Sequence, residues 1–197
     1  MLNISKLSVK RREKTLFSDM SFNISPGTAV GLTGANGTGK SSLILSILDL
    51  IPYSGTISKS FAPAEMGVVW QDRGLPLNVS PSRWFSYLSN LYSQPIDESL
   101  TERFELDLVN KPIRSFSGGE QQKIAIVSAF FHKPKMLILD EPTVGLDEQA
   151  RSIFYDLCSH ATAKGSSILI TSHLSQDISA VTENKIDLSA PNSGGKE

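Results

Sequence analysis

The segment from Gly34 to Ser41 constrains this chain most, because it reads Gly-Ala-Asn-Gly-Thr-Gly-Lys-Ser and so has the spacing Gly-x-x-x-x-Gly-Lys-Ser. In this spacing the backbone N–H groups of the loop converge on an anion, and the following helix adds the positive end of its dipole. Residues 28–33 predict a short apolar strand, and residues 42–48 predict an apolar helix. The segment therefore predicts a phosphate-binding loop (P-loop) within an α/β fold.

Two side chains at the end of this loop have specific tasks in binding a nucleotide. Lys40 supplies a point charge for the β- and γ-phosphates, and Ser41 offers a hydroxyl oxygen to Mg²⁺. The ligand is therefore expected to be a nucleoside triphosphate with magnesium. The expected contacts with it form one run of residues: Gly34, Ala35, Asn36, Gly37, Thr38, Gly39, Lys40, Ser41 and Ser42.

Size and charge limit the classes of function. The chain has 197 residues and a formal net charge of −1, which fits one domain and gives no electrostatic case for binding nucleic acid. Its single cysteine, Cys158, lies in an apolar pattern and is expected to be buried rather than reactive. No apolar run approaches the roughly 20 residues that span a bilayer. We expect a protein of the cytosol, or one held at the cytosolic face of a membrane by a partner.

The order of the predicted elements indicates a mainly parallel sheet. After a β-rich start, strands alternate with helices, and residues 135–139 and 167–171 are continuous apolar runs typical of buried parallel strands. Residues 72–116 carry several prolines and little β-branched content, which predicts a mostly helical inserted lobe. The predicted organisation is a single domain over 1–190, with core segments 1–72 and 118–190, the lobe at 73–117, and a disordered tail at 191–197.

Acidic and polar side chains follow several of the predicted strands. Asp140 and Glu141 come directly after residues 135–139; beside a P-loop, the first acid can hold Mg²⁺ and the second can orient or deprotonate water. Gln71 and His173 follow two further strands. Taken singly, each of these residues could be structural. Because ligands bind at the carboxyl ends of parallel strands, we expect all four side chains to lie near the P-loop.

A second anion-binding turn is predicted at Ser117, Gly118 and Gly119. The turn opens a helix predicted over residues 120–131, so that backbone N–H groups and a helix dipole face outward. Ser117 can also cap this helix, and Glu120 can complete a capping box with it. The structural and the functional interpretation are compatible.

The chain resembles the ATP-binding cassette (ABC) ATPase family, because six features occur in the order found in that family. They are the P-loop, Gln71, the Ser-Gly-Gly-Glu turn, the Leu-Asp-Glu strand end, the Gly-Leu-Asp segment that ends at Asp147, and His173. The resemblance covers nearly the whole chain, and the Ser-Gly-Gly turn is its discriminating element. It implies a P-loop NTPase (RecA-like) α/β core with an N-terminal antiparallel β-subdomain and an inserted α-helical signature lobe. It also implies an ATPase whose reaction is coupled to transport.

The resemblance implies roles for residues of one subunit. Ser41, Gln71 and Asp140 would hold Mg²⁺, and Gln71 would report the state of the nucleotide to the neighbouring lobe. Glu141 would be the general base. His173 would contact the γ-phosphate of ATP.

The resemblance also implies a second ABC ATPase subunit, identical or different, packed head to tail. Ser117, Gly118 and Gly119 would contact the γ-phosphate of ATP bound to the opposite subunit, and Asp147 would cross the interface. Two such subunits would enclose two ATP molecules. This arrangement explains why one chain carries two phosphate-binding turns.

Arg11 stands where family members often stack an aromatic residue on adenine. A guanidinium plane can also stack on a base, but it would select the base loosely, so GTP is expected to be hydrolysed as well as ATP. The sequence Asn-Lys-Ile-Asp at residues 184–187 matches the guanine-reading motif of GTPases. The Ser-Gly-Gly turn and the Asp-Glu pair fit GTPases poorly, so we interpret this match as a coincidence in the last strand.

The chain resembles the separate ATPase subunit of a multi-subunit ABC transporter. Its lobe would dock on an integral membrane subunit and so hold the chain at the cytoplasmic face of the cell membrane. The candidate contacts, most of which are expected to pack internally instead, are Trp84, Phe85, Tyr87 and Leu91.

Two alternatives remain within this family. Residues 11–22 resemble the start of the haem-exporter ATPases of cytochrome c biogenesis, although the Ser-Gly-Gly-Glu turn differs from the Ser-Ala-Gly-Gln usual there. An ATPase of the iron–sulfur-assembly type would instead work with soluble partners. The nature of the partner, membrane-embedded or soluble, distinguishes these readings.

Overall fold

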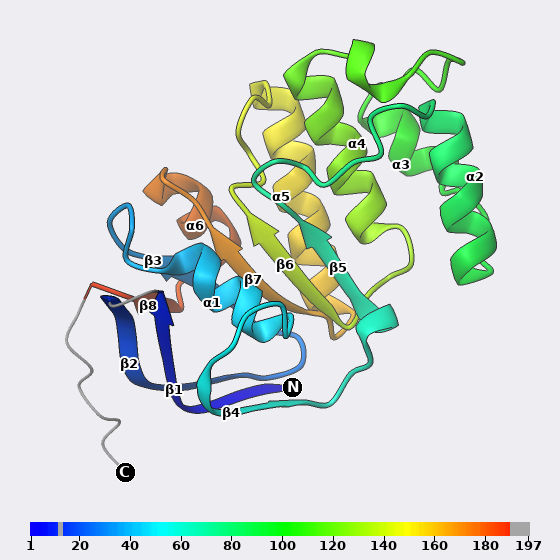
Figure 1. Ribbon diagram of the computed structural model, residues 1–197. Coiled ribbons are helices and arrows are strands. Elements are labelled where there is room, and N and C mark those ends of the chain that lie inside the picture. The colour runs from blue at the N-terminus through cyan, green and yellow to red at the C-terminus, as the bar shows by residue number, and fades with distance from the viewer. Residues whose placement is uncertain (12–13, 190–197) are drawn as a thin grey trace.

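Figure 1 shows the computed structural model of the chain, which describes residues 1–11 and 14–189. The predicted disordered tail at 191–197 lies outside these residues. In chain order the elements are β1 (Leu2–Arg11), β2 (Lys14–Ile24), β3 (Ala29–Thr33), α1 (Lys40–Ile47), β4 (Ser54–Lys59), a 3₁₀ turn η1 (Pro63–Glu65), β5 (Met66–Val69), α2 (Pro81–Tyr92), α3 (Glu98–Arg103), a 3₁₀ turn η2 (Ile113–Ser115), α4 (Gly118–Phe130), β6 (Met136–Asp140), α5 (Glu148–Ala163), β7 (Ser167–Thr171), α6 (Ser175–Val181) and β8 (Lys185–Asp187).

The strands form two sheets, as the sequence predicts. β2, β1 and β4 make an antiparallel sheet, drawn in blue and cyan at the lower left of Figure 1. β5, β6, β7, β3 and β8 make a second sheet in that order, and all its pairs are parallel. The expected α/β core with an N-terminal antiparallel β-subdomain is therefore confirmed. The parallel order also brings the carboxyl ends of β3, β6 and β7 to one edge.

The continuous apolar run of β6 follows from burial on both faces of the parallel sheet. Met136 and Ile138 face a cluster that contains α1 and the antiparallel sheet. Leu137 and Leu139 face the opposite cluster, which contains α4, α5 and the inserted lobe. Successive side chains of a strand alternate between faces, so a strand covered on both sides is apolar throughout. Cys158 on α5 is 1% exposed within the second cluster, as expected.

The inserted lobe contains α2, α3 and η2, joined by irregular segments, and lies at the upper right of Figure 1. Phe85 is fully buried, and its ring stacks on Phe131 with centroids 6.4 Å apart. The indole N–H of Trp84 donates to Ser128 Oγ at 2.8 Å, which ties α2 to α4. Tyr87 and Leu91 are 55% and 56% exposed. Of the four residues named as candidate partner contacts, only these last two are mostly exposed, and the ring of Tyr87 stacks on that of Trp84.

Two strand glycines allow helices to lie directly against the parallel sheet. A Cβ on Gly31 of β3 would lie 2.2 Å from Cγ2 of Ile178 on α6. A Cβ on Gly67 of β5 would lie 2.1 Å from the carbonyl oxygen of Ala129 on α4. Neither approach is compatible with a side chain, so these positions set how closely α6 and α4 pack on the sheet.

The helices predicted over residues 42–48 and 120–131 differ from the observed α1 and α4 by one or two residues at each end. The helix predicted over residues 42–48 begins at Lys40, because the last residues of the P-loop already belong to its first turn. α5 begins at Glu148, with Asp147 as its N-cap. Within the described residues, no helix is both long and apolar enough to cross a membrane.

Candidate functional site

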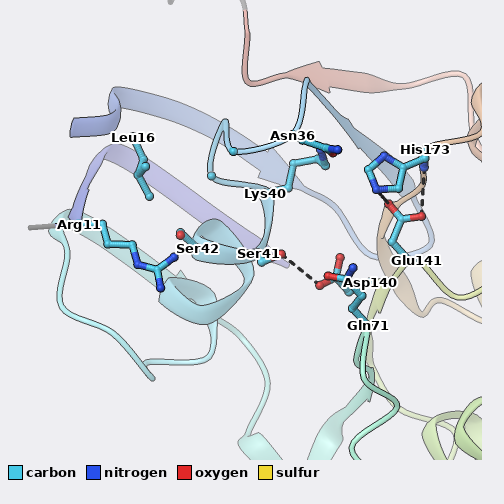
Figure 2. Close-up of a pocket in the computed structure, with 12 residues that line it drawn as sticks. Arg11, Leu16, Asn36, Lys40, Ser41, Ser42, Gln71, Asp140, Glu141 and His173 are labelled. Atoms are coloured by element: carbon cyan, nitrogen blue, oxygen red, sulfur yellow. Dashed lines mark hydrogen bonds and ion pairs between the residues drawn. The ribbon is translucent and has the colours of Figure 1, made fainter. Parts of the chain in front are cut away.

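A cavity of about 320 Å³ lies where the P-loop meets the carboxyl ends of β6 and β7. Figure 2 shows Asn36 and Lys40 of the P-loop segment across from Asp140, Glu141 and His173. The residues that line it come from the hairpin, the P-loop and three strand ends: Arg11, Leu16, Asn36, Gly37, Gly39, Lys40, Ser41, Ser42, Gln71, Asp140, Glu141 and His173. The strand-end residues expected near the P-loop are therefore all in one place.

The P-loop is held in shape by its own hydrogen bonds. Lys40 Nζ donates to the carbonyl oxygens of Gly34 at 2.6 Å and Ala35 at 3.2 Å, so the ammonium group lies over the loop. Thr38 Oγ1 donates to Ala35 O at 2.9 Å. Gly39 adopts φ 105° as the residue that precedes α1, a conformation that favours glycine. Gly34, Ala35 and Thr38 thus shape the loop, whereas its remaining predicted residues line the cavity.

Ser41 and Asp140 place two oxygen atoms that can bind a metal ion side by side in the lining of the cavity. Ser41 Oγ donates to Asp140 Oδ2 at 3.4 Å, and Thr171 Oγ1 donates to Asp140 Oδ1 at 2.6 Å. Thr171 is fully buried, and its hydrogen bond fixes the position of the Asp140 carboxylate. Thr171 was not among the predicted site residues, although a hydroxyl at the end of β7, the strand that pairs with β6, is a visible signal.

This donor set fits Mg²⁺. A hydroxyl, a carboxylate and the amide of Gln71 are hard oxygen ligands around one cavity. Within residues 1–11 and 14–189 there is no group of three or more His, Cys, Asp or Glu able to hold a metal. Mg²⁺ in nucleotide sites takes one or two protein ligands and completes its octahedron with phosphates and water. The sparse donor set is the kind that such an ion uses.

Glu141 is a buried carboxylate that faces the cavity. Its side chain is 5% exposed, and its Oε2 accepts a hydrogen bond of 3.1 Å from the backbone N–H of His173. Oε1 lies 3.3 Å from His173 Nε2, an ion-pair distance, but it has no hydrogen-bond partner among the described residues. Burial raises the pKa of the Glu141 carboxyl, and the hydrogen bond and charge of His173 offset part of this shift. A raised pKa makes this carboxylate a stronger base than an exposed one.

The backbone at Glu141 contributes to this placement. Glu141 has φ 53°, a left-handed conformation that non-glycine residues seldom adopt. Its N–H donates to Thr171 Oγ1 at 3.0 Å, which holds the turn against the end of β7. Among the described residues, eight other than glycine have a positive φ, and of these Glu141 alone lines the cavity.

Arg11 and Leu16 form the opposite end of the cavity from Glu141 and His173 (Figure 2). Arg11 ends β1, and Leu16 lies near the start of β2. A guanidinium plane and an apolar side chain together offer a surface for a nucleobase. Leu16 was missed by the sequence analysis, and its place just after the charged turn was the available signal.

The Ser-Gly-Gly turn lies away from this cavity. Ser117 Oγ accepts from Glu120 N at 3.2 Å, and Glu120 Oε2 accepts from Ser117 N at 2.7 Å, so the predicted capping box is confirmed. Asp147 also caps a helix: its Oδ1 accepts from Ala150 N at 2.7 Å. Ser117, Gly118, Gly119 and Asp147 do not line the cavity. Asn184 to Asp187 do not line it either, and Lys185–Asp187 form β8.

A parallel sheet with a P-loop, a strand-end Asp-Glu pair and a cavity of about 320 Å³ between them defines a P-loop nucleoside triphosphatase. Comparison with known proteins narrows this class. The family described as "ABC transporter" matches residues 17–144. The chain therefore belongs to the ABC transporter family, as its ATP-binding and ATP-hydrolysing subunit.

Known relatives and a solved structure agree with this assignment. The chain is 32% identical over 178 residues to the zinc import ATP-binding protein ZnuC of Yersinia pestis bv. Antiqua (strain Antiqua), which covers 88% of this chain and 70% of the relative. It is 34% identical over 174 residues to the Nod factor export ATP-binding protein I of Azorhizobium caulinodans. This alignment covers 80% of this chain and 54% of the relative. The dimeric structure of a post-hydrolysis state of the ATP-binding cassette MJ0796, bound to ADP and Pi, matches with a TM-score of 0.80 at 20% identity, covering 95% of this chain and 94% of that one. At that identity the structural match shows the fold alone.

Proposed function

We propose that this chain binds Mg²⁺ and ATP in the cavity beside the P-loop and hydrolyses ATP with Glu141 as general base. The observation that supports this most is the position of Glu141: a buried carboxylate, with one oxygen free of hydrogen bonds, in the cavity that Lys40 also lines. Glu141 would take a proton from a water molecule as the water oxygen bonds to the γ-phosphorus. The bond between that phosphorus and the β-phosphate oxygen breaks, and ADP and phosphate are released.

The other cavity residues would bind and orient the triphosphate. Lys40 would exchange its two carbonyl contacts for oxygens of the β- and γ-phosphates, and His173 would contact the γ-phosphate. Ser41, Gln71 and Asp140 would hold Mg²⁺, which when bound neutralises charge on the phosphates. Arg11 and Leu16 would pack against the base.

We propose further that two such subunits combine head to tail. The turn at Ser117 presents the N-terminus of a 13-residue helix, yet it lies outside the ATP cavity of its own chain. Placed on the partner's ATP, Ser117, Gly118 and Gly119 would complete the phosphate site, and Asp147 would lie at the interface. The solved structure reported above is described as a dimer bound to ADP and Pi, which supports this arrangement. The partner is a second ABC ATPase subunit, as a homodimer or a heterodimer.

We also propose that an integral membrane subunit binds the chain and holds it peripherally at the cytoplasmic face. A surface groove between α2, α4 and the segment after β5 supports this. Tyr87 and Leu91 are exposed large side chains along it, beside the half-buried Trp70 and Trp84. Exposed aromatic and apolar side chains gathered in one groove are typical of protein interfaces. The relatives reported above are transporter subunits, and none of them is an iron–sulfur-assembly or haem-export protein.

The test compares the unaltered chain with Glu141→Gln and with Glu183→Gln, the same substitution at an exposed residue outside the cavity. The unaltered chain and Glu183→Gln should hydrolyse ATP, and Glu141→Gln should bind ATP and accumulate as a dimer in size-exclusion chromatography. Glu141→Gln with ATP should also capture an integral membrane protein from detergent-solubilised membranes. Unchanged hydrolysis in Glu141→Gln would remove its proposed role, and recovery of soluble partners alone would refute the membrane subunit.

A further inference from the structure

Asp177 on α6 is a buried carboxylate outside the ATP cavity. It is 0% exposed. Its Oδ1 accepts a hydrogen bond of 2.6 Å from Tyr155 Oη, and its Oδ2 accepts from Ser172 Oγ at 2.9 Å and from Thr143 Oγ1. Three hydroxyl groups from three separate segments therefore converge on one carboxylate.

A carboxylate in this position is costly unless it is fully hydrogen-bonded. Removing an ionised carboxylate from water costs several kcal/mol, and proteins offset that cost with charged partners or several donors. Within the part of the chain that the structure describes, no cationic side chain forms an ion pair with Asp177. The three hydroxyl groups are its compensation. Burial and the hydrogen bond to Asp177 raise the pKa of Tyr155 to about 12, so this hydroxyl remains a donor.

The donors are placed beside the residues that carry the proposed chemistry. Thr143 follows Glu141 by two positions, and it is 1% exposed. Ser172 immediately precedes His173, and its Oγ also accepts from the N–H of Leu174 at 3.0 Å. The hydroxyl of Ser172 therefore fixes the backbone on both sides of His173. Asp177 connects the turn after β6 with the turn after β7.

Tyr155 adds α5 to the same connection. Its ring lies on the helix whose N-cap is Asp147, the residue proposed to lie at the dimer interface. On the other side of the turn after β6, the buried amide of Gln122 on α4 donates to Pro142 O at 2.9 Å. The turn that carries Glu141 is thus held both by Asp177 and by the helix that the Ser-Gly-Gly turn opens.

We infer that Asp177 is a positioning residue for ATP hydrolysis: its carboxylate binds Thr143 and Ser172 and thereby sets the place of Glu141 relative to His173. This inference rests on the proposed roles of Glu141 and His173. It assigns Asp177 no contact with ATP, so its loss should lower kcat and leave the binding of ATP almost unchanged. A misplacement of about 1 Å at catalytic groups costs on the order of 100-fold in rate.

The experiment uses a pair of substitutions at Thr143, together with Asp177→Asn. Thr143→Val keeps the shape and removes the hydroxyl, whereas Thr143→Ser keeps the hydroxyl. We expect Asp177→Asn and Thr143→Val to lower kcat by about 10- to 100-fold, with KM and the Kd for ATP changed by less than about three-fold. Thr143→Ser should retain a kcat near that of the unaltered chain.

Cys158→Ala provides the control for stability. Cys158 is buried on α5 and is not among the three residues whose hydroxyl groups donate to Asp177. This variant should therefore have a lower melting temperature and an unchanged kcat. Full kcat in Thr143→Val, with Glu141→Gln inactive, would overturn the inference and leave the proposed function standing. An equal loss of kcat in Thr143→Val and Thr143→Ser would also overturn it. If Asp177→Asn does not fold, the Thr143 pair decides alone. Absence of ATPase activity in the unaltered chain would refute the proposed function, and this inference with it.

Discussion

Replacing Glu141 by Gln should stabilise the ATP-free protein at neutral pH while it abolishes hydrolysis. The carboxylate is 5% exposed, and its Oε1 has no hydrogen-bond partner among the described residues. Burial disfavours the ionised carboxylate, as its raised pKa shows, and His173, whose Nε2 lies 3.3 Å from Oε1, offsets only part of this cost. Glutamine has the same shape and carries no charge, so we expect a gain of about 1 kcal/mol, the low end of the cost of an incompletely compensated buried group. In a chain of this length, 1 kcal/mol raises the melting temperature by about 2–4 °C.

The stabilisation should depend on pH in a defined direction. Burial raises the pKa of Glu141 in the folded protein above that of the unfolded chain, where a glutamate titrates near 4.3. At pH values above the folded pKa the ionised group therefore destabilises the fold. As the pH falls through the folded pKa toward about 4.3, both states bind the proton and the cost disappears. The difference in melting temperature between Glu141→Gln and the unaltered chain should shrink over this window.

The assay is differential scanning calorimetry of nucleotide-free protein at neutral pH and at about pH 4.5. Steady-state hydrolysis measured in parallel should fall by about 10²- to 10⁴-fold, the usual contribution of a general base. Glu183→Gln, an exposed substitution, should change neither quantity. A less stable Glu141→Gln at neutral pH, or a difference that widens as the pH falls, would refute the reasoning.

Three further predictions concern the phosphate site, the helix cap and the base. Lys40→Ala should weaken ATP binding at least about 100-fold with unchanged circular dichroism; a fluorescent nucleotide titration that shows native affinity would contradict the P-loop assignment. Ser117→Ala should lower the free energy of unfolding by about 1 kcal/mol, the usual value of a lost N-cap, which calorimetry measures. It should also reduce ATP-driven dimerisation, which light scattering measures, and an unchanged dimer would contradict the proposed role of the turn. If Arg11 selects the base loosely, the kcat/KM values for GTP and ATP should differ by less than about ten-fold. A strict preference for ATP would contradict this role of Arg11.

Most of the candidate site could be predicted from the sequence because its chemistry depends on local order. Lys40 and Ser41 follow a recognisable loop, and Asp140 and Glu141 follow a strand whose buried character is visible as an unbroken apolar run. Parallel strands share one edge for their carboxyl ends, and this places such residues together without further information. The capping box at Ser117 is likewise a spacing of three residues.

The missed residues depend on contacts between distant segments. The position of Thr171 at a strand end was visible in the sequence, but its contact with Asp140, 31 positions away, was not. Asp177 likewise meets Thr143, 34 positions away, and no spacing rule encodes such a pair. Leu16 lies in an ordinary strand and becomes a cavity residue only when the hairpin folds over the P-loop. On α2 the sequence offers apolar side chains on more than one face, so it could not show that Phe85 faces inward and Leu91 outward.

Gly31 and Gly67 affect the nucleotide site although neither residue lines the cavity, because they determine how closely two helices pack on the sheet. A side chain at Gly31 would collide with Ile178 on α6, the helix that carries Asp177, and either the Ile178 side chain or α6 would have to shift. A side chain at Gly67 would collide with the backbone carbonyl of Ala129, which cannot move without the helix that the Ser-Gly-Gly turn opens. A misplacement of about 1 Å at catalytic groups can cost on the order of 100-fold in rate. Both glycines therefore belong among the positions that affect activity. Even an alanine there would disturb the packing of a helix that supports the nucleotide site.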